Sequence, residues 1–341
     1  MKIKEVFLNL KREPIKLSRK YGNLKIRNRK EEGKAMKWGD KRYYSLNYFL
    51  RQKFGCKVFK ISLDGGFSCP NRDGTISKGG CVFCSERGSG DFAGNRELSI
   101  QQQFKFIKEV MNKKWKKGKY IAYFQAYTNT YAAVDVLRQK YEEAINEDDV
   151  VALAIATRPD CLGEDVLNLL EEISKRVYLW IELGLQTSNE ETAKKINRGY
   201  DLVTFQKAIG NLRKRNIDVV THVIFGLPGE TKEDMLNTVK YVSEKDIQGI
   251  KFHLLHLMKN TPLMEFYNKG ELKFLSQEEY IDIICSSISI IPPNIVIHRL
   301  TGDSPRNLLV EPQWSLKKWE ILNAINSAME KREIYQGIYY K

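Results

Sequence analysis

The chain has 341 residues, enough for one large domain or two medium ones, and its composition (42% hydrophobic, 29% charged) supports a folded core rather than wholesale disorder. No apolar run approaches the roughly 20 residues of a membrane-spanning helix, and the N-terminal apolar segment is too short for a secretory signal. We therefore expect a cytoplasmic protein that does not enter a membrane.

The positive charge is concentrated at the N-terminus. The formal net charge is +14; residues 1–60 hold 19 Lys and Arg against 5 Asp and Glu, and the remaining 281 residues hold 37 of each. We expect residues 1–40 to form a basic extension and residues 41–341 to form the folded body. Such an extension suits a polyanion such as nucleic acid, and it is equally compatible with a solvated tail that only aids solubility.

Beyond the extension, strand-like and helix-like segments alternate. Short β-branched and aromatic runs predict strands over residues 57–63, 120–125, 150–156, 178–184, 218–226, 249–256 and 294–301. Apolar residues at three- and four-residue spacing predict helices over residues 99–115, 163–175, 202–215, 232–245, 277–290 and 315–332. This alternation predicts an α/β fold with a parallel sheet covered by helices, either a barrel or an open doubly wound sheet.

The most informative segment is the Gly-rich loop after the first predicted strand. It carries Cys69, Cys81 and Cys84, with eleven residues between the first two and two between the last two. In a β/α barrel this loop lies at the C-terminal face, where active sites are built. Three thiolates can bind three irons of a cubane cluster and leave the fourth iron open to a ligand.

Two other interpretations of these cysteines are weaker. A structural zinc site needs four ligands, but Cys56 lies at the opposite end of the predicted strand and every histidine is far along the chain. A redox pair of Cys81 and Cys84 lacks the helix start that follows such a motif in thioredoxin-like proteins. The ligand count therefore favours an iron–sulfur cluster.

Several motifs resemble those of radical S-adenosylmethionine (SAM) enzymes. The loop reads CPNRDG…GGCVFC, with the aromatic Phe83 directly before the last cysteine. Residues 180–199 and 222–231 are similar to the fourth- and fifth-strand regions of the elongator catalytic subunit and of oxygen-independent coproporphyrinogen oxidase. Residues 251–263 resemble the sixth-strand segment of the elongator-like branch. The YtqA/YhcC family is the most similar, through KWGDKRYYSLNYFLRQKFG, ISLDGGFSCPNRDGT, CVFCSERGSGDF, TRPDCL and HRLTGDSP.

This resemblance implies a partial (β/α) barrel of radical SAM type, with about six to seven βα units behind the basic extension. It implies that Cys69, Cys81 and Cys84 ligate a [4Fe–4S] cluster whose open iron is chelated by SAM. Reduction by a donor such as flavodoxin or ferredoxin then yields a 5′-deoxyadenosyl radical that takes hydrogen from the substrate. The eleven-residue spacing exceeds the common three, but the YtqA/YhcC family shares it.

The resemblance also implies contacts to SAM. Gln186 matches a position that hydrogen-bonds the ribose, and Arg198 matches one that pairs with the carboxylate, although an ordinary helix-end charge is the alternative. Phe83 and Phe225, the latter in the IFGLPGET turn, are expected at the cofactors, with the turn forming an apolar wall for adenine. The usual glycine-rich segment is missing, and Gln125 stands in its place as a contact to SAM or as a buried strand end.

Glu182 lies in an otherwise apolar strand, where a carboxylate is costly unless it is paired or faces a site. Many relatives carry a ribose-binding Glu on the third strand, where this chain has Ala156. We therefore expect Glu182 to contact the ribose hydroxyls instead. No role is assigned to His222, to His253 and His256, or to the polar segment 298–303.

Three functions compete. A tRNA base is favoured by the basic N-terminus, by seven lysines against Glu109 in residues 105–119, and by the elongator resemblance. YtqA-like members are associated with converting the carboxymethylaminomethyl group of wobble uridine to aminomethyl. The first alternative is a small metabolite or peptide substrate. The second, a metal-stabilised nucleic-acid-binding module, is disfavoured because Gln186, Arg198 and GLPGET would serve no purpose in it.

Overall fold

The computed structural model describes residues 36–115 and 118–340. The described residues belong to one compact unit, Ala35–Lys341. Most of the predicted basic extension therefore lies outside the described residues. Trp38 falls within residues 1–40, yet it is only 2% exposed and stacks on Tyr44, so the folded unit begins before residue 41. No helix in the described ranges is long and apolar enough to cross a bilayer.

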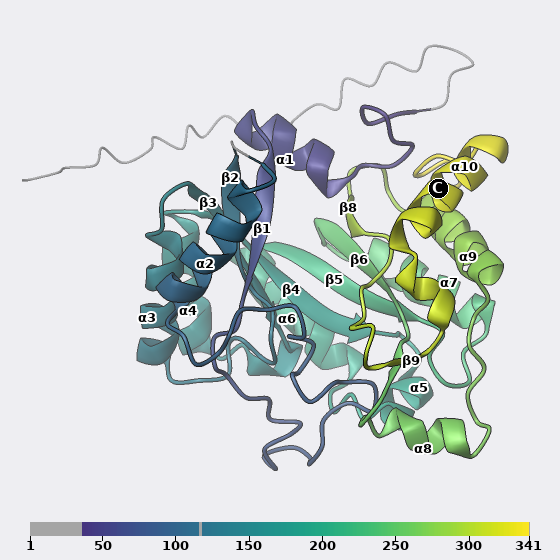
Figure 1. Cartoon of the computed structure of the whole chain (residues 1–341), viewed down its shortest axis with the longest axis horizontal. Helices are drawn as coiled ribbons and strands as arrows, with labels where there is room; N and C mark the ends of the chain where they lie inside the picture. The colour runs from purple at the N-terminus through teal and green to yellow at the C-terminus, as the bar shows by residue number, and fades with distance from the viewer. Residues whose placement is uncertain (1–35, 116–117, 341) are drawn as a thin grey trace, which may run out of the picture. The chain divides into compact units, whose positions relative to one another are not determined.

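Seven parallel strands form one sheet in the order β1-β2-β3-β4-β5-β6-β8 (Figure 1). Each strand follows its neighbour in the chain through a helical crossover, so β1 and β8 are the outer strands of a half-barrel. This confirms the predicted partial (β/α) barrel. The strands are Val58–Leu63 (β1), Lys119–Phe124 (β2), Val150–Thr157 (β3), Tyr178–Gln186 (β4), Asp218–Phe225 (β5), Gly249–Leu254 (β6) and Val296–Arg299 (β8).

Most helices lie on the convex side of this sheet, and hydrogen bonds from side chains fix where several of them begin. Ser99, Thr231 and Ser276 each form a capping box at a helix N-terminus. The helices are Leu46–Phe54 (α1), Ile100–Asn112 (α2), Val134–Ile145 (α3), Glu164–Ser174 (α4), Glu190–Lys195 (α5), Leu202–Lys214 (α6), Lys232–Ser243 (α7), Leu263–Asn268 (α8), Gln277–Ile290 (α9) and Lys318–Lys331 (α10).

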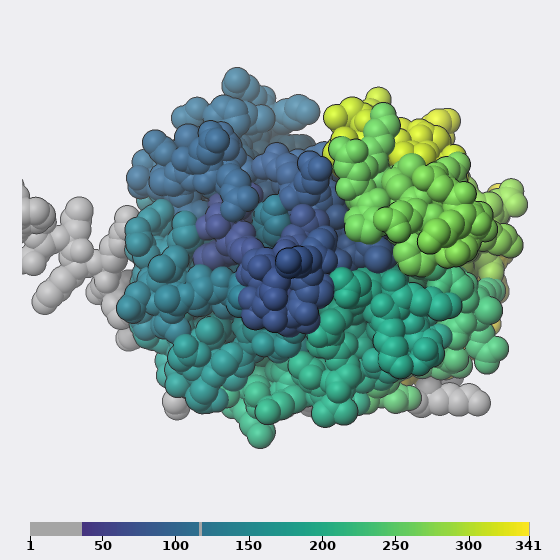
Figure 2. All heavy atoms as spheres, turned by 90° about the horizontal axis from the view of Figure 1, so that it is seen from below, coloured from purple at the N-terminus to yellow at the C-terminus, as the bar shows by residue number. Residues whose placement is uncertain are grey.

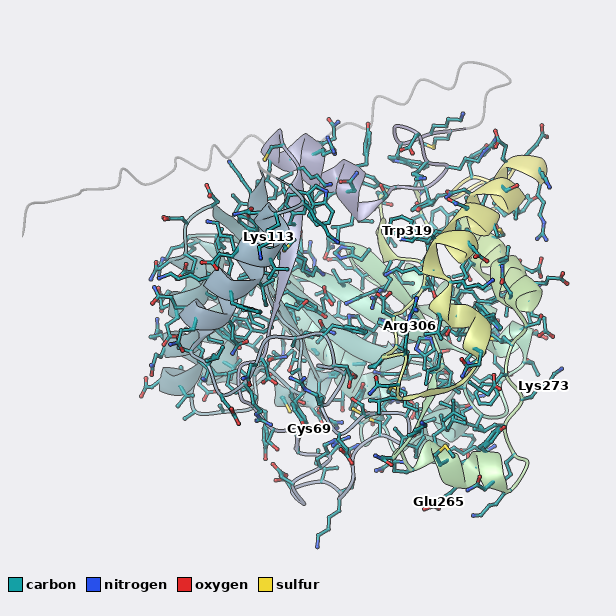
Figure 3. The ribbon with its side chains drawn as sticks, in the orientation of Figure 1. Cys69, Lys113, Glu265, Lys273, Arg306 and Trp319 are labelled. Atoms are coloured by element: carbon teal, nitrogen blue, oxygen red, sulfur yellow. The ribbon has the colours of Figure 1, made fainter. Side chains whose placement is uncertain are left out.

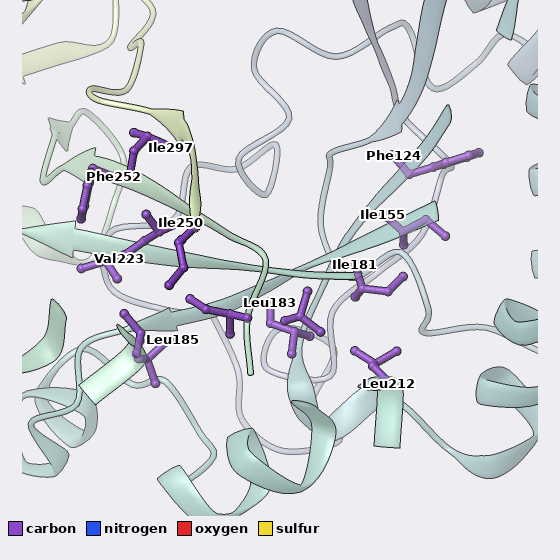
Figure 4. Close-up of a cluster of buried hydrophobic side chains, with 14 of the residues drawn as sticks. Phe124, Ile155, Ile181, Leu183, Leu185, Leu212, Val223, Ile250, Phe252 and Ile297 are labelled. Atoms are coloured by element: carbon purple, nitrogen blue, oxygen red, sulfur yellow. The ribbon is translucent and has the colours of Figure 1, made fainter. Parts of the chain in front are cut away.

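The main hydrophobic core lies between the sheet and these helices. Alternate residues of every strand point to it, because side chains in a strand point to opposite faces in turn. On β4 these are Ile181, Leu183 and Leu185, each completely buried. Figure 4 shows them beside equivalent side chains of other strands and Leu212 of α6. A smaller cluster on the concave face, around Trp180, is covered by Leu50 of α1.

Some elements differ from the prediction. The predicted strand 249–256 ends at Leu254, and Leu257–Met258 (β7) instead pairs with Leu309–Glu311 (β9) in a separate antiparallel ribbon. Helices α1, α3, α5 and α8 had not been predicted; α5 and α8 have six residues each, too few to show a helical period. The tail after α10 packs back, because the Gln336 side chain binds the backbone of Tyr44, Pro292 and Ile295.

Candidate active site at the open end of the half-barrel

A cavity of about 250 Å³ lies where the strands end and the cysteine loop crosses them. Cys69, Cys81 and Cys84 all line it, as do inward-facing residues of β2 to β6. Figure 2 looks onto this end of the molecule, where the loop after β1 (dark blue) stands between the β2–β4 side and the α8 side. Figure 3 labels Cys69 in that loop. The structure thus brings the three predicted ligands to one cavity.

The cysteine loop is held by its own polar side chains. Arg72 donates hydrogen bonds to the carbonyl oxygens of Cys84 (2.9 Å) and Ser85 (2.5 Å). Asn71, completely buried, donates to the carbonyl of Asn197 at 2.6 Å and to Cys81 Sγ at 3.6 Å. Gly80 has φ +85°, and a Cβ there would come within 2.9 Å of the Arg72 side chain. These contacts fix the loop over the strand ends.

The chemistry of the thiols suits a bound cluster of metal cations. Burial raises the pKa of Cys81 to about 12 and also raises the pKa of Cys84, and the neighbouring thiols add to the shift at Cys81. Deprotonating Cys81 and Cys84 in this cavity therefore requires a nearby cation, as iron provides. Among the described residues, no group of three or more His, Cys, Asp or Glu side chains is arranged to bind a single metal ion. In an iron–sulfur cubane each thiolate binds its own iron.

Four of the predicted SAM contacts line the same cavity: Phe83, Gln125, Glu182 and Gln186. Gln186 has φ +66° at a β-bulge between β4 and β5, and Tyr200 donates a hydrogen bond to its Oε1 at 3.1 Å. The Nε2 of Gln125 donates to the carbonyl of Ser89 in the cysteine loop at 2.8 Å. Their contacts to SAM stay predictions, and their positions are compatible with them.

Phe225 requires a correction. Its side chain is completely buried on the convex face, where it stacks on Phe252. The preceding residue, Ile224, lines the cavity instead. Neighbouring side chains in a strand point to opposite faces of the sheet. The predicted apolar wall therefore belongs to Ile224, one residue before Phe225.

Arg198 is also placed differently from the expectation. Its side chain is 1% exposed, and it does not line the cavity. Its guanidinium donates to the carbonyls of Leu185, Thr187 and Tyr200 and to both carboxylate oxygens of Glu190, at 2.8–3.3 Å. These contacts show Arg198 anchoring the segment after β4.

Arg158 is the arginine that reaches the cavity wall from β3. It pairs with Asp160 through two hydrogen bonds of 2.9 and 2.7 Å and donates to the carbonyl of Arg198 at 2.9 Å. Its positive charge lowers the pKa of Cys81, against the larger effect of burial. The sequence analysis assigned no role to Arg158, because no pattern in the sequence shows which arginine reaches the cavity.

Glu182 is the centre of a buried polar network on the concave face. Its Oε1 accepts from Lys60 Nζ (3.0 Å) and Trp180 Nε1 (3.2 Å), and its Oε2 contacts Lys251 Nζ (2.6 Å) and His222 Nε2 (2.8 Å). Burial alone would raise the pKa of Glu182, but Lys251 and Lys60 outweigh it and hold the pKa well below its usual range. The carboxylate is therefore ionised and already holds four donors.

The two lysines were missed in the sequence, although a signal for them exists. Lys60 and Lys251 are single charged residues in the apolar strands VFKISL and GIKFHL, the same pattern that singled out Glu182. Burial lowers the pKa of Lys251 to about 7, and its Nζ also donates to the Tyr123 hydroxyl at 3.0 Å. Three charged residues on three inward-facing strand positions predict one network inside the barrel.

The histidines of β5, of β6 and of the short segment after β6 face the cavity as neutral groups. His222, His253 and His256 line it, and burial lowers the pKa of each, to about 4 for His222 and His256. The Nε2 atoms of His253 and His256 are buried without a hydrogen-bond partner in the described part of the chain. Buried polar atoms are ordinarily hydrogen-bonded, so these two nitrogens have capacity for a ligand or water.

Comparison with known proteins finds two matching family models. Residues 72–242 match the Radical SAM superfamily, and residues 247–331 match the Radical_SAM C-terminal domain. The chain is 55% identical over 302 residues to YtqA of Bacillus subtilis (strain 168). The aligned residues cover 89% of this chain and 94% of YtqA. It is 40% identical over 271 residues to YhcC of Escherichia coli (strain K12), covering 79% of this chain and 86% of YhcC.

More distant similarities include one protein named for tRNA and one solved structure. The tRNA uridine(34) acetyltransferase of Methanocaldococcus jannaschii is 31% identical over 199 residues, which cover 58% of this chain and 36% of that protein. Among solved structures, Methanocaldococcus infernus Elp3 with an N-terminal deletion aligns with a TM-score of 0.61 at 18% identity. The alignment covers 82% of this chain and 64% of that chain, and it shows a shared fold.

Proposed function

Because the chain belongs to the radical SAM superfamily, with YtqA and YhcC among its relatives, we propose that it modifies the wobble uridine of tRNA. The proposed reaction converts the carboxymethylaminomethyl side chain of that uridine to aminomethyl. The N–C bond to the carboxymethyl group breaks, water supplies the oxygen with which that group leaves as a two-carbon oxo acid, and the two electrons pass to SAM as it is cleaved to methionine and 5′-deoxyadenosine. The chain is a radical SAM enzyme, and the cofactors are a [4Fe–4S] cluster and SAM. When bound, these cofactors supply a 5′-deoxyadenosyl radical that abstracts hydrogen. The electron comes from a donor such as flavodoxin or ferredoxin.

The observation that carries the enzymatic part is the convergence of Cys69, Cys81 and Cys84 on one cavity at the strand ends. These three thiolates hold the cluster in the proposal. Gln186 and Gln125 then orient SAM by hydrogen bonds, while Phe83 and Ile224 provide apolar contacts that exclude water. Glu182 would contact the ribose hydroxyls of SAM, either directly or through the lysines and His222 that it holds.

The tRNA part is supported by surface chemistry as well as by the relatives. Helix α2 and the residues after it expose Lys105, Lys113 and Lys114 beside the exposed rings of Phe106 and Trp115. Figure 3 labels Lys113 at the end of this helix. Lysines attract phosphates, and exposed aromatic rings stack on unpaired bases. The basic residues 1–35 add to this charge, and together they suit an RNA partner.

The test is nucleoside mass spectrometry of bulk tRNA from a strain that lacks the gene. The proposal predicts that carboxymethylaminomethyluridine accumulates and aminomethyluridine disappears. Complementation with the wild-type gene should restore the profile, whereas the Cys84→Ala gene should not. An unchanged nucleoside profile in the deletion strain would contradict the tRNA assignment and favour a small-molecule or peptide substrate.

A further inference from the structure

We propose that a second cavity, between β1 and β8, binds an anionic group of the substrate next to the reacting position. This inference rests on the proposed function and specifies what the enzyme recognises. The cavity measures about 760 Å³ and lies at the open side of the half-barrel, between its two outer strands. It shares six lining residues with the cysteine cavity: Phe92, Tyr123, Gln125, Lys251, Arg299 and Asp303. A bound molecule can therefore extend from one cavity into the other.

Positive charge dominates the wall of this second cavity. Lys60 and Lys251 line it from β1 and β6, and three more cations line it from the C-terminal part of the chain: Arg299 at the end of β8, Arg306 in the segment after β8, and Lys318 at the start of α10. Figure 3 labels Arg306 in the segment after β8. Five cationic side chains thus face one cavity, which predicts attraction for an anion.

Two carboxylates only partly balance these cations. Asp303 accepts from Arg299 and from Lys318, each at 2.5 Å. Glu182, completely buried, holds Lys60 and Lys251. Arg306 has no hydrogen bond or ion pair to any described residue. Since two cations share each carboxylate and Arg306 has no partner within residues 36–115 and 118–340, the wall has capacity for further negative charge.

Polar groups without partners line the same cavity. Ser304 Oγ, Ser315 Oγ and His298 Nδ1 are buried and have no hydrogen-bond partner in the described residues. Ser315 as a whole is only 5% exposed. Buried hydroxyl groups are normally hydrogen-bonded, so these atoms point to a ligand that accepts hydrogen bonds. An oxyanion satisfies both the unpartnered donors and the surplus of cations.

A carboxylate and a phosphate share this chemistry, and the proposed substrate contains both. The carboxymethylaminomethyl group ends in a carboxylate, and each neighbouring nucleotide carries a phosphate. The shared wall at Tyr123, Gln125 and Lys251 would hold either one beside the cysteine cavity. A methyl ester removes the charge of the carboxylate, and uridine lacks the charge of the phosphate. Comparing each neutral compound with its anionic partner therefore shows which of the two groups the cavity binds.

The test measures binding to the oxidised holoenzyme with SAM by equilibrium dialysis. The probes are carboxymethylaminomethyluridine and its methyl ester, uridine 5′-monophosphate and uridine, and inorganic phosphate alone. The variant is Arg306→Gln/Lys318→Gln, because neither residue lies in the core. The matched control is Arg332→Gln, which removes a surface arginine paired with Asp282 on α9. Circular dichroism and cluster absorbance verify that each variant is folded and loaded.

For a carboxylate subsite, the wild type should bind the acid at least about tenfold tighter than the ester, and the double variant should lose that difference. For a phosphate subsite, the same contrast should appear between uridine 5′-monophosphate and uridine. The control should behave as the wild type. If the anionic and neutral members of both pairs bind equally, or if the double variant keeps the full preference, the subsite proposal is overturned.

Inorganic phosphate separates this proposal from the proposed function. If phosphate binds the wild type and not the double variant while tRNA from the deletion strain is unchanged, the anion subsite is supported and the tRNA assignment fails. If tRNA modification is lost in the deletion strain while no anionic probe is preferred, the tRNA assignment is supported and the subsite fails.

Discussion

The two faces of the half-barrel sheet are built from the same strands and do different work. On β4 the convex face presents Ile181 and Leu183, whereas the concave face presents Trp180 and Glu182 one residue away. The convex face packs on helices and holds the fold together through apolar burial. The concave face buries charged and polar groups, which cost stability unless they are paired or serve a site. The contrast predicts that substitutions on the two faces will fail in different ways.

The largest effect is expected at the cysteine loop, which belongs to the concave side. Cys69→Ala, Cys81→Ala or Cys84→Ala should each lower iron content and reduce 5′-deoxyadenosine formation by more than about 100-fold, because each removes a cluster ligand. Anaerobic iron analysis and product quantification measure this. Cys285→Ala is the control, since that buried cysteine packs on the convex side. Full activity in any of the three loop variants would rule out that cysteine as a ligand.

Ile224 and Phe225 are neighbours on β5 that point to opposite faces of the sheet, so their variants compare the two faces directly. Phe225→Ala should destabilise the protein by about 3–5 kcal/mol, because it leaves a cavity in the convex core. Ile224→Ala removes a side chain from the wall of the active site, so it should weaken SAM binding more than stability. Urea unfolding and SAM titration of both variants measure the split. If Phe225→Ala affected SAM binding more than Ile224→Ala did, the register of the site described above would be contradicted.

Glu182→Gln tests the charged network on the concave face. Removing the carboxylate leaves Lys251 and Lys60 without their buried counter-charge, so we expect a loss of about 3 kcal/mol in unfolding free energy. If Glu182 also serves SAM, affinity for SAM should fall while iron content stays intact. Lys53→Gln, at a lysine that lies over the Tyr178 ring, is the matched control for loss of a charged side chain. Wild-type stability and SAM affinity in Glu182→Gln would refute both roles.

The smallest effect concerns pH and the neutral histidines of the concave face. Burial lowers the pKa of His298 to about 3, so below pH 6.5 the unfolded chain takes up a proton that the folded chain does not. Stability should therefore fall as pH decreases, by about 1 kcal/mol for this histidine between pH 7 and 5.5. Urea unfolding at the two pH values should show a smaller drop in His298→Gln than in wild type. An equal drop would mean that His298 titrates normally in the folded protein.

The same contrast explains what the sequence could predict. All seven strands of the sheet were predicted to within two residues at each end, because convex-face residues such as Leu153 and Ile155 repeat with a strong apolar pattern. Cys69, Cys81 and Cys84 were predicted as cluster ligands because all three lie on one loop. The roles of Arg158 and Arg198 depend on which guanidinium reaches the cavity, and the tertiary path of the chain decides that. Lys60 and Lys251 carried a readable signal, namely a charge at an inward position of an apolar strand.

The central claim is that the cofactors bound in the cavity of Cys69, Cys81 and Cys84 generate a radical that acts on tRNA. The direct measurement incubates the reduced holoenzyme with SAM and tRNA from the deletion strain, and quantifies 5′-deoxyadenosine and the wobble nucleoside by mass spectrometry. The account predicts that carboxymethylaminomethyluridine is converted to aminomethyluridine as 5′-deoxyadenosine accumulates, and that Cys84→Ala forms neither product. Formation of 5′-deoxyadenosine with no change in any tRNA nucleoside would contradict it.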